Sequence, residues 1–477
     1  MAGLGVAAIG LSGSRPASAQ ASSGGEQEWA LETGEYFYSS PTVVDGTVFV
    51  GRGDANLYAM DANSGEQQWA FGTGGTVRSS PMVVDGTVFV GSEDGNLYAV
   101  DAATGRQQWV FETGGPVHSS PMVVDGTVFV GSQDGNLYAV DATTGEQEWA
   151  FETGDFVRSS PTVAEGTVFV GSHDLYLYAV DAATGAQQWA FETSTGTVRS
   201  APTVMDGTVF VGCGDGALYA VDAATGEQEW TFETGRSVES SPTVAEGTVF
   251  FGSHDEHLYA VDAASGEQVW TFETGDWVQS SPTVVDTTVF VGCGDSNLYA
   301  VDAATGEQEW AFGTDYSVGA SPTVVDGTVF FGEGTYEDRC KFYAVDAGVS
   351  GSSEASRATL GTLGHHGDWQ YADQSLDIPT PTETPTETAA PTETLTETAT
   401  PTEELPENTE TPDSTGDTTN SGSGEGMTTM NGDDDDAVTS ESGPGFGAGG
   451  ALTGLGAVGY MLQRRRSNAD TEAELSK

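Results

Sequence analysis

The chain has 477 residues, of which 72 are Asp or Glu and 14 are Lys or Arg, so its formal net charge at pH 7 is −58. This charge excludes nucleic acid and anionic membrane surfaces as partners for the body of the protein, because both would repel it. Three cysteines are too few for a disulfide-based scaffold, and their odd number leaves at least one thiol unpaired.

The acidic composition also indicates the medium in which the chain folds. A charge of this size opposes compaction through self-repulsion, and salt relieves it, since the Debye length falls to about 3 Å at 1 M salt. Only two of the basic residues are lysines, Lys341 and Lys477. The acid-rich, lysine-poor composition resembles that of proteins from salt-loving archaea, and this resemblance implies a high-salt environment.

Residues 1–19 have two of the three parts of a secretory signal peptide. A short apolar stretch is followed by Ala17-Ser18-Ala19, a cleavage sequence of the small-x-small type. The positively charged part is missing, so we expect the natural start to lie upstream, with a twin-arginine segment. The alternative is a fortuitously apolar N-terminus.

Repeats of about 40 residues fill the chain from residue 26 to residue 346. Each carries a tryptophan at the same repeat position, and a one-residue insertion near Ser194 is the one break in the spacing. Self-similarity at this period indicates structural units that stack on one another. The repeated tryptophans are Trp29, Trp69, Trp109, Trp149, Trp189, Trp230, Trp270 and Trp310.

Each repeat contains four short segments rich in β-branched and aromatic residues. In the unit that begins at Val77 they read SSPMVV, TVFVG, LYAVD and RQQWVFET. Asp85-Gly86 predicts a two-residue hairpin, and a second turn lies around Asp94-Gly95. Four strands without a helical period predict a propeller blade, and eight such units predict an all-β, eight-bladed β-propeller.

The eighth repeat lacks its own fourth strand. After Asp346 the chain reads AGVSGSSEASRATLGTLG, which has no segment of the EQxW type. We therefore expect the N-terminal segment around Trp29 to complete the eighth blade, closing the ring and removing the exposed edges that invite aggregation. A strand around Trp369 is the alternative.

The recurring pattern AxDxxTGxxxW has a physical logic at each position. Asp101 caps the turn that follows it, Gly105 permits a positive φ, and Trp109 offers a flat face to the neighbouring blade. The pattern resembles the tryptophan-docking motif of the pyrroloquinoline-quinone (PQQ) type repeats, over residues 26–346. That family includes quinoprotein alcohol dehydrogenases and the propeller lipoprotein of the bacterial outer-membrane barrel-assembly machine, and many members bind no quinone.

The resemblance leaves a quinoprotein dehydrogenase, with PQQ and calcium, as the alternative function. Such enzymes carry a disulfide between adjacent cysteines, a calcium site and a catalytic Asp. Here Cys213 and Cys293 occupy equivalent turns two blades apart, and so do His173 and His254. Side chains on separate blades do not converge on one metal ion. We therefore expect no catalytic, metal or cofactor site.

Differences between the repeats gather at the link that enters each blade and at the turn between its second and third strands. These two places share one face of a propeller, which we call the funnel face, around the mouth of the central channel. The candidate ligand-binding residues are Tyr36, Tyr38, Arg78, His118, Phe156, Arg158, Arg199, Glu239, Trp277 and Gln279.

Three arginines share one repeat position on this face. Arg78, Arg158 and Arg199 form a positive arc in a very acidic chain, with aromatic residues close by. Arginine with aromatic residues is the composition of binding hot spots. The sequence thus predicts a monomeric binding or assembly scaffold whose ligand is a surface protein, a peptide or an anion. The alternative is that these arginines only pair with neighbouring acids.

Residues 374–443 are rich in Thr, Pro and Glu and end with a run of Asp at 433–436. This composition cannot bury a core, so we expect a disordered, extended stalk between residue 373, where we place the end of the propeller domain, and the C-terminal segment.

Residues 444–466 combine Pro444-Gly445-Phe446, an apolar stretch that ends at Leu462, and three arginines at 464–466. The stretch is just long enough for a membrane helix, and the arginines place the tail, 467–477, in the cytoplasm. The order resembles the PGF-type sorting signal of archaeal surface proteins. The resemblance implies cleavage by an archaeosortase-type enzyme and attachment to a lipid. A plain membrane anchor is the alternative, and either one leaves the propeller on the outer face of the cell.

Overall fold

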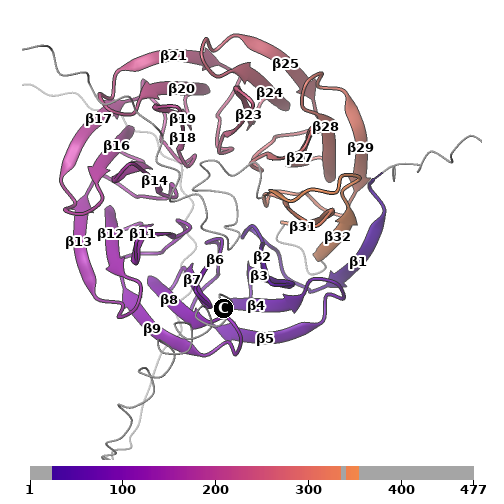
Figure 1. Cartoon of the computed structure of the whole chain (residues 1–477), viewed down its shortest axis with the longest axis horizontal. Helices are drawn as coiled ribbons and strands as arrows, with labels where there is room; N and C mark the ends of the chain where they lie inside the picture. Colours follow the sequence, from indigo (N-terminus) through magenta and orange to yellow (C-terminus); the bar gives the residue numbers. More distant parts are fainter. Residues whose placement is uncertain (1–23, 335–339, 354–477) are drawn as a thin grey trace, which may run out of the picture. The chain divides into compact units, whose positions relative to one another are not determined.

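The computed structural model describes residues 24–334 and 340–353, and these form a β-propeller (Figure 1). Eight antiparallel sheets of four strands each follow one another around a central axis, so the predicted fold and blade number are confirmed. The predicted signal peptide, stalk, sorting segment and tail lie outside the described residues, as does Trp369. Within the described residues, no helix has the length and apolar character to cross a membrane.

The strands of the first four blades run in chain order from the channel to the rim. Blade one consists of β2 (Thr42–Val44), β3 (Thr47–Arg52), β4 (Asn56–Asp61) and β5 (Gln67–Gly72). Blade two consists of β6 (Met82–Val84), β7 (Thr87–Gly91), β8 (Asn96–Asp101) and β9 (Gln107–Glu112). Blade three consists of β10 (Met122–Val124), β11 (Thr127–Gly131), β12 (Asn136–Asp141) and β13 (Gln147–Glu152). Blade four consists of β14 (Thr162–Ala164), β15 (Thr167–Gly171), β16 (Tyr176–Asp181) and β17 (Gln187–Glu192).

The other four blades repeat this order, except that the last takes its outer strand from the N-terminus. Blade five consists of β18 (Thr203–Met205), β19 (Thr208–Gly212), β20 (Ala217–Asp222) and β21 (Gln228–Glu233). Blade six consists of β22 (Thr243–Ala245), β23 (Thr248–Ser253), β24 (His257–Asp262) and β25 (Gln268–Glu273). Blade seven consists of β26 (Thr283–Val285), β27 (Thr288–Cys293), β28 (Asn297–Asp302) and β29 (Gln308–Gly313). Blade eight consists of β30 (Thr323–Val325), β31 (Thr328–Gly332), β32 (Lys341–Asp346) and β1 (Gln27–Glu32).

The N-terminal strand closes the ring, as predicted. β1 pairs with β32 in antiparallel register, with Trp29 opposite Ala344, and the two strands lie side by side in Figure 1. The Trp29 indole also donates a hydrogen bond to the carbonyl oxygen of Ala62 in blade one, at 2.9 Å. The first strand of the chain therefore completes the last blade and joins it to the first.

Each repeated tryptophan lies against the next blade. Trp109 packs over Gly145, whose φ is 73°, and donates from Nε1 to the Ala142 carbonyl oxygen at 3.0 Å. A Cβ at Gly145 would lie 2.8 Å from the indole, so this position requires glycine for space as well as for its backbone conformation. The same indole-to-carbonyl bond occurs at Trp29, Trp69, Trp149, Trp189, Trp230, Trp270 and Trp310.

The innermost strands are shorter than the sequence predicts. In blade two, β6 begins at Met82, because Ser80 and Pro81 bond to neighbouring blades instead of to β7; Pro81 O accepts from Thr42 Oγ1 of blade one. Ser80 N donates to Ser120 Oγ of blade three at 2.9 Å. Equivalent bonds run around the channel and close from Ser321 N to Ser40 Oγ, with one break at Ala201.

Candidate functional site

Each blade has two ends, and backbone hydrogen bonds identify which segments meet at each. At one end the hairpin between the first two strands bonds to the turn after the third, as in Ala102 N to Gly86 O at 2.8 Å. We call this end the turn face. At the other end Glu93 N, in the turn between β7 and β8, donates to Thr76 O in the inter-blade link at 2.9 Å. The variable link and turn positions therefore share the funnel face.

Alternation along each link directs the variable side chains outward. Val77 lies between Thr76 and Arg78, is 1% exposed, and packs so closely on Gly51 of the preceding blade that a Cβ there would collide with it. In an extended segment, the residues on either side of a buried one point the opposite way. Phe37 takes the place of this valine in blade one and packs against Gly332 of blade eight.

An aspartate in the turn between the second and third strands holds the frame of this face. Asp134 Oδ2 accepts hydrogen bonds from the Tyr138 hydroxyl at 2.7 Å and from Gly114 N at 2.6 Å. Burial alone would raise the pKa of Asp134, but these bonds and those from Asn136 outweigh it and lower the pKa below its ordinary value. The frame is thus fixed by an ionised carboxylate.

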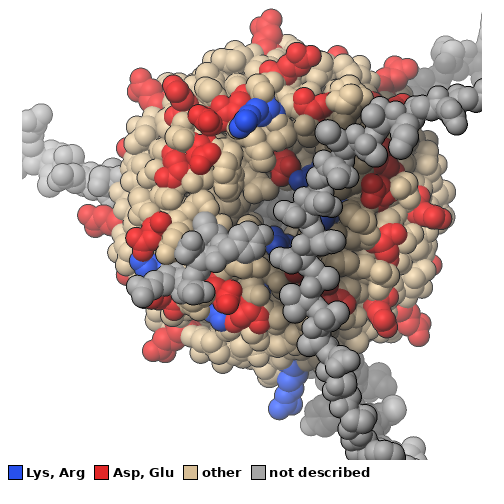
Figure 2. Space-filling view, turned by 180° about the vertical axis from the view of Figure 1, so that it is seen from behind, with Lys and Arg blue, Asp and Glu red and all other residues tan. Residues whose placement is uncertain are grey.

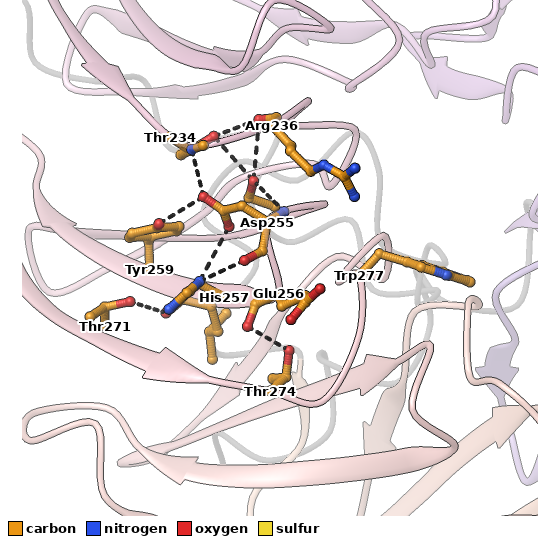
Figure 3. A network of polar contacts seen from close by, with 12 residues as sticks. Thr234, Arg236, Asp255, Glu256, His257, Tyr259, Thr271, Thr274 and Trp277 are labelled. Carbon is orange, nitrogen blue, oxygen red and sulfur yellow. Dashed lines mark hydrogen bonds and ion pairs between the residues drawn. The ribbon is translucent and has the colours of Figure 1, made fainter.

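Blade six shows the same frame with one substitution (Figure 3). Asp255 Oδ2 accepts from the Tyr259 hydroxyl at 2.9 Å and from Gly235 N at 2.6 Å. His257 stands where four of the other blades have Asn, and its Nδ1 lies 2.8 Å from the Asp255 carbonyl oxygen. Figure 3 shows Trp277 set apart from this network. The histidine therefore belongs to the frame, whereas the tryptophan is available for other contacts.

Blade eight builds the frame from a residue that the sequence analysis did not single out. Glu333 is fully buried, and its Oε1 accepts from the Tyr343 hydroxyl at 3.0 Å and from Asp315 N at 2.8 Å. Its Oε2 accepts from Lys341 N at 2.7 Å. Glu333 stands directly after the strand glycine, where blades two to seven have Ser or Cys and blade one has Arg52, and that departure from the repeat is the signal that could have identified it.

Two of the three funnel arginines are paired with acids. Arg78 Nε lies 2.6 Å from Glu93 Oε1, which is also 3.2 Å from His118 Nε2. Arg199 Nη1 lies 2.9 Å from Glu239 Oε1, and Gln279 Nε2 donates to the other oxygen of Glu239 at 3.0 Å. Arg78 and Arg199 therefore pair with neighbouring acids, which is the alternative that the sequence left open.

Arg158 differs from the other two. Its Nη2 donates to the neutral Gln133 Oε1 at 3.0 Å, and its buried Nε has no hydrogen-bond partner. Among the described residues, no carboxylate forms an ion pair with it. The guanidinium carbon lies 5.6 Å from the ring centroid of Phe156, which is 40% exposed, and that ring is 5.8 Å from the ring of His173.

The positive charges of the funnel arginines lower the pKa values of the basic side chains near them. Burial and the nearby Arg158 lower the pKa of His118 to about 4, and burial and Arg199 do the same to His173. Burial and Arg199 also lower the pKa of Arg158 itself. Both histidines are therefore neutral at pH 7, and the arginines carry the positive charge.

Aromatic side chains lie on both sides of this arc. Tyr36 and Tyr38 pack edge to face at 4.8 Å, and the Arg78 guanidinium lies 4.4 Å from the centroid of the Tyr38 ring. Farther round the ring, Trp277 lies 6.1 Å from the His254 ring. Figure 2 shows one face of the propeller with a central hollow, basic side chains at that hollow and acidic side chains spread around it. Such a surface suits recognition of a ligand with both charged and apolar parts.

The residues of the propeller do not fit PQQ with calcium. Cys213 and Cys293 are buried in blades five and seven, and their Sγ atoms lie 3.2 and 3.3 Å from the carbonyl oxygens of Gly196 and Asp276. Burial raises the pKa of both thiols to about 11. Within residues 24–334 and 340–353, no three His, Cys, Asp or Glu side chains gather in a way that could hold a metal ion.

The blades, the docked tryptophans and the two faces define the class of protein as a β-propeller of PQQ-like repeats. The sequence model of the outer membrane protein assembly factor BamB family matches residues 17–120, 112–203, 176–310 and 254–374. These matches span most of the chain, and the protein belongs to that family. No curated protein sequence matches the chain.

Solved structures share the fold at low sequence identity. BamB from Moraxella catarrhalis is 18% identical with a TM-score of 0.59, covering 67% of this chain and 99% of its own. The quinohemoprotein alcohol dehydrogenase from Comamonas testosteroni is 18% identical with a TM-score of 0.57, covering 68% and 76%. The computationally designed Ika8 protein is 17% identical with a TM-score of 0.60, covering 67% and 99%. An assembly factor, an enzyme and a designed protein share this fold, so the fold alone does not identify the function.

Proposed function

We propose that the protein is a binding or assembly scaffold on the outer surface of the cell, and that its funnel face binds a peptide or another anionic partner. One observation carries this proposal. Side chains that differ from blade to blade gather on the funnel face, above a frame of buried valines and turn carboxylates that barely changes. Loops on a rigid scaffold are where binding residues concentrate.

The location rests on the sequence outside the described residues. The apolar segment and cleavage sequence in residues 1–19 support export, and the PGF-type segment at 444–466 supports attachment by lipid or helix. The Thr-rich stalk would then hold the propeller away from the membrane. Processing by an archaeosortase-type enzyme belongs to the same proposal.

The test compares the two faces of the full chain in its native envelope. One variant carries Arg78→Ser, Arg158→Ser and Arg199→Ser on the funnel face. The matched control carries three substitutions of exposed residues on the turn face, Asn63→Ser, Arg106→Ser and Thr143→Ser. After mild cross-linking, the proteins isolated with each variant are quantified.

The expected result is that the proteins isolated with the natural chain are lost from the funnel variant and retained by the turn-face control. Equal retention by both variants would contradict a binding role for the funnel face. Equal loss from both would also contradict it, since the effect would then not depend on the face.

A further inference from the structure

Among the described residues, Arg158 has no carboxylate in direct ion-pair contact. The two neighbouring funnel arginines, Arg78 and Arg199, each have a glutamate within 3 Å, whereas Arg158 bonds only to the neutral Gln133. A partly buried cation among other cations is unfavourable without a counter-charge. Glu239 and Glu93 attract Arg158 without forming an ion pair with it, so its guanidinium remains open to a negatively charged group of a ligand.

The surroundings of Arg158 add an apolar surface. Phe156 precedes it by two residues on the same link, and its side chain is one of three large hydrophobic ones that are clearly exposed among the residues that the structure describes. The Arg158 guanidinium and the His173 ring both lie within 6 Å of the Phe156 ring, measured to its centroid. His173 Nε2 is buried and has no hydrogen-bond partner. Blade four thus presents a cation, an aromatic face and an unsatisfied imidazole together.

We infer that Arg158 binds a carboxylate of a peptide ligand, with Phe156 packing on the apolar group beside that carboxylate. This inference rests on the proposed function and names the ligand chemistry at that site. Guanidinium and carboxylate match in planar geometry and form strong, charge-assisted hydrogen bonds. The carboxylate is either the C-terminus of a chain or an acidic side chain.

Counting charges favours a single carboxylate over a phosphate group. Arg78 and Arg199 are neutralised by Glu93 and Glu239, so one positive charge remains in this arc. A carboxylate carries one negative charge, whereas a phosphate monoester carries close to two at neutral pH. The second charge would meet the funnel glutamates and the strongly acidic surface around them.

His173 gives a readout that depends on the position of the ligand. Its pKa of about 4 results from burial and from Arg199 and Arg158, while Asp155 and Glu239 act in the opposite direction. A carboxylate placed beside Arg158 would offset the two arginines and raise the pKa of His173. A ligand bound elsewhere on the ring would leave that pKa unchanged.

The experiment titrates the full chain with three small peptides at fixed salt, by isothermal titration calorimetry. The probes are N-acetyl-alanyl-phenylalanine with a free carboxylate, its amide, and N-acetyl-glutamyl-phenylalanine amide. Either carboxylate-bearing probe is expected to bind ~10- to 100-fold more tightly than the amide. The first and third probes separate the two sources, a chain terminus and an acidic side chain.

The matched variants are Arg158→Gln and Arg106→Gln, since Arg106 is an exposed arginine at the turn face. Arg158→Gln is expected to remove the preference for the carboxylate, and Arg106→Gln is expected to leave it intact. Saturation of the natural chain with a carboxylate probe is expected to raise the pKa of His173, measured by NMR. Equal binding of all three probes would overturn the inference, and so would natural affinity in Arg158→Gln, an equal loss in Arg106→Gln or an unmoved His173 pKa.

Failure here is distinguishable from failure of the proposed function. If the carboxylate probes show no preference but the funnel variant still loses its partners, the inference is wrong and the scaffold role stands. If the probes behave as expected but partner capture does not depend on the funnel face, the scaffold role is wrong.

Discussion

The two faces of the propeller are built from the same repeat but satisfy their polar groups differently. On the turn face, Asp101 Oδ1 accepts hydrogen bonds from both the backbone and the hydroxyl of Thr104, and the Trp69 indole bonds to Ala102 O. On the funnel face, the turn aspartates accept hydrogen bonds from tyrosine hydroxyls, but several buried polar atoms have no hydrogen-bond partner, among them Arg158 Nε and His173 Nε2. One face is self-contained, and the other has bonding capacity left for a ligand.

This difference separates stability from specificity within one repeat. Residues that vary between blades sit beyond a frame that does not need them, so they can change without affecting the fold. Residues that recur bond to the next blade, so a change in one weakens an interface between blades. Substitutions at matched residues can therefore test whether recurring residues determine stability and variable residues determine binding.

The largest effect on stability is expected when a tryptophan docked on the next blade is removed. A tryptophan of the funnel face provides the comparison. Trp149→Ala removes an indole that is 9% exposed and bonded to Ala182 O, so the free energy of unfolding should fall by about 3–5 kcal/mol. Trp277→Ala truncates a half-buried funnel residue and should lower it by about 1 kcal/mol. Denaturant unfolding at constant salt measures both, and equal losses would contradict the separation.

An intermediate effect is expected from the frame carboxylate, and it depends on pH. Asp134→Asn weakens the bonds from Tyr138 and Gly114 and should therefore lower the free energy of unfolding at pH 7. The loss should be only about 1 kcal/mol, because the partly exposed charge is screened by solvent. The native pKa of Asp134 is depressed, so its stabilisation is present above the unfolded pKa, near 3.8, and is lost as pH falls through the lower native value. The difference between the natural chain and the variant should therefore shrink below pH 3.8.

Asp125→Asn is the control for this measurement. Asp125 lies in an exposed hairpin with φ of 51°, a conformation that Asn also adopts readily. Its substitution should leave the free energy of unfolding and its pH dependence unchanged. A difference between Asp134→Asn and the natural chain that stays constant down to pH 2 would show that ionisation of Asp134 does not hold the frame.

The strands, turns and tryptophan docking of the blades could be predicted from the sequence because nearly the same residue pattern occurs in every repeat. The hairpin at Asp85-Gly86, where both residues have positive φ, and the docking of Trp109 are local patterns, and the indole-to-carbonyl bond recurs at all eight repeated tryptophans. Closure by the segment around Trp29 followed from counting strands. The membership of the funnel face followed from the order of turns in a four-stranded blade.

What could not be predicted depends on contacts between side chains of different blades. Arg78, Arg158 and Arg199 occupy equivalent positions, yet only the first and third meet a glutamate, because Glu93 and Glu239 stand where other blades have different residues. Glu333 serves the frame from a position that is Ser or Cys in blades two to seven, because its longer side chain reaches Tyr343. The hydrogen bond from Ser80 N to Ser120 Oγ and its equivalents could not be predicted either, because they run between blades.

The smallest effect on stability, and the sharpest test of the funnel, is expected from Glu239→Gln. Glu239 pairs with Arg199, whose side chain is 41% exposed, and such pairs contribute about 0–1 kcal/mol, so unfolding should change little. The substitution frees the charge of Arg199 beside Arg158, so the carboxylate probes should bind ~2- to 5-fold more tightly. Glu148→Gln removes the same charge from an exposed site on the outer strand β13 and should change neither quantity. An equal gain in affinity from both variants would show that the overall charge, and not the pairing within the funnel, controls anion binding.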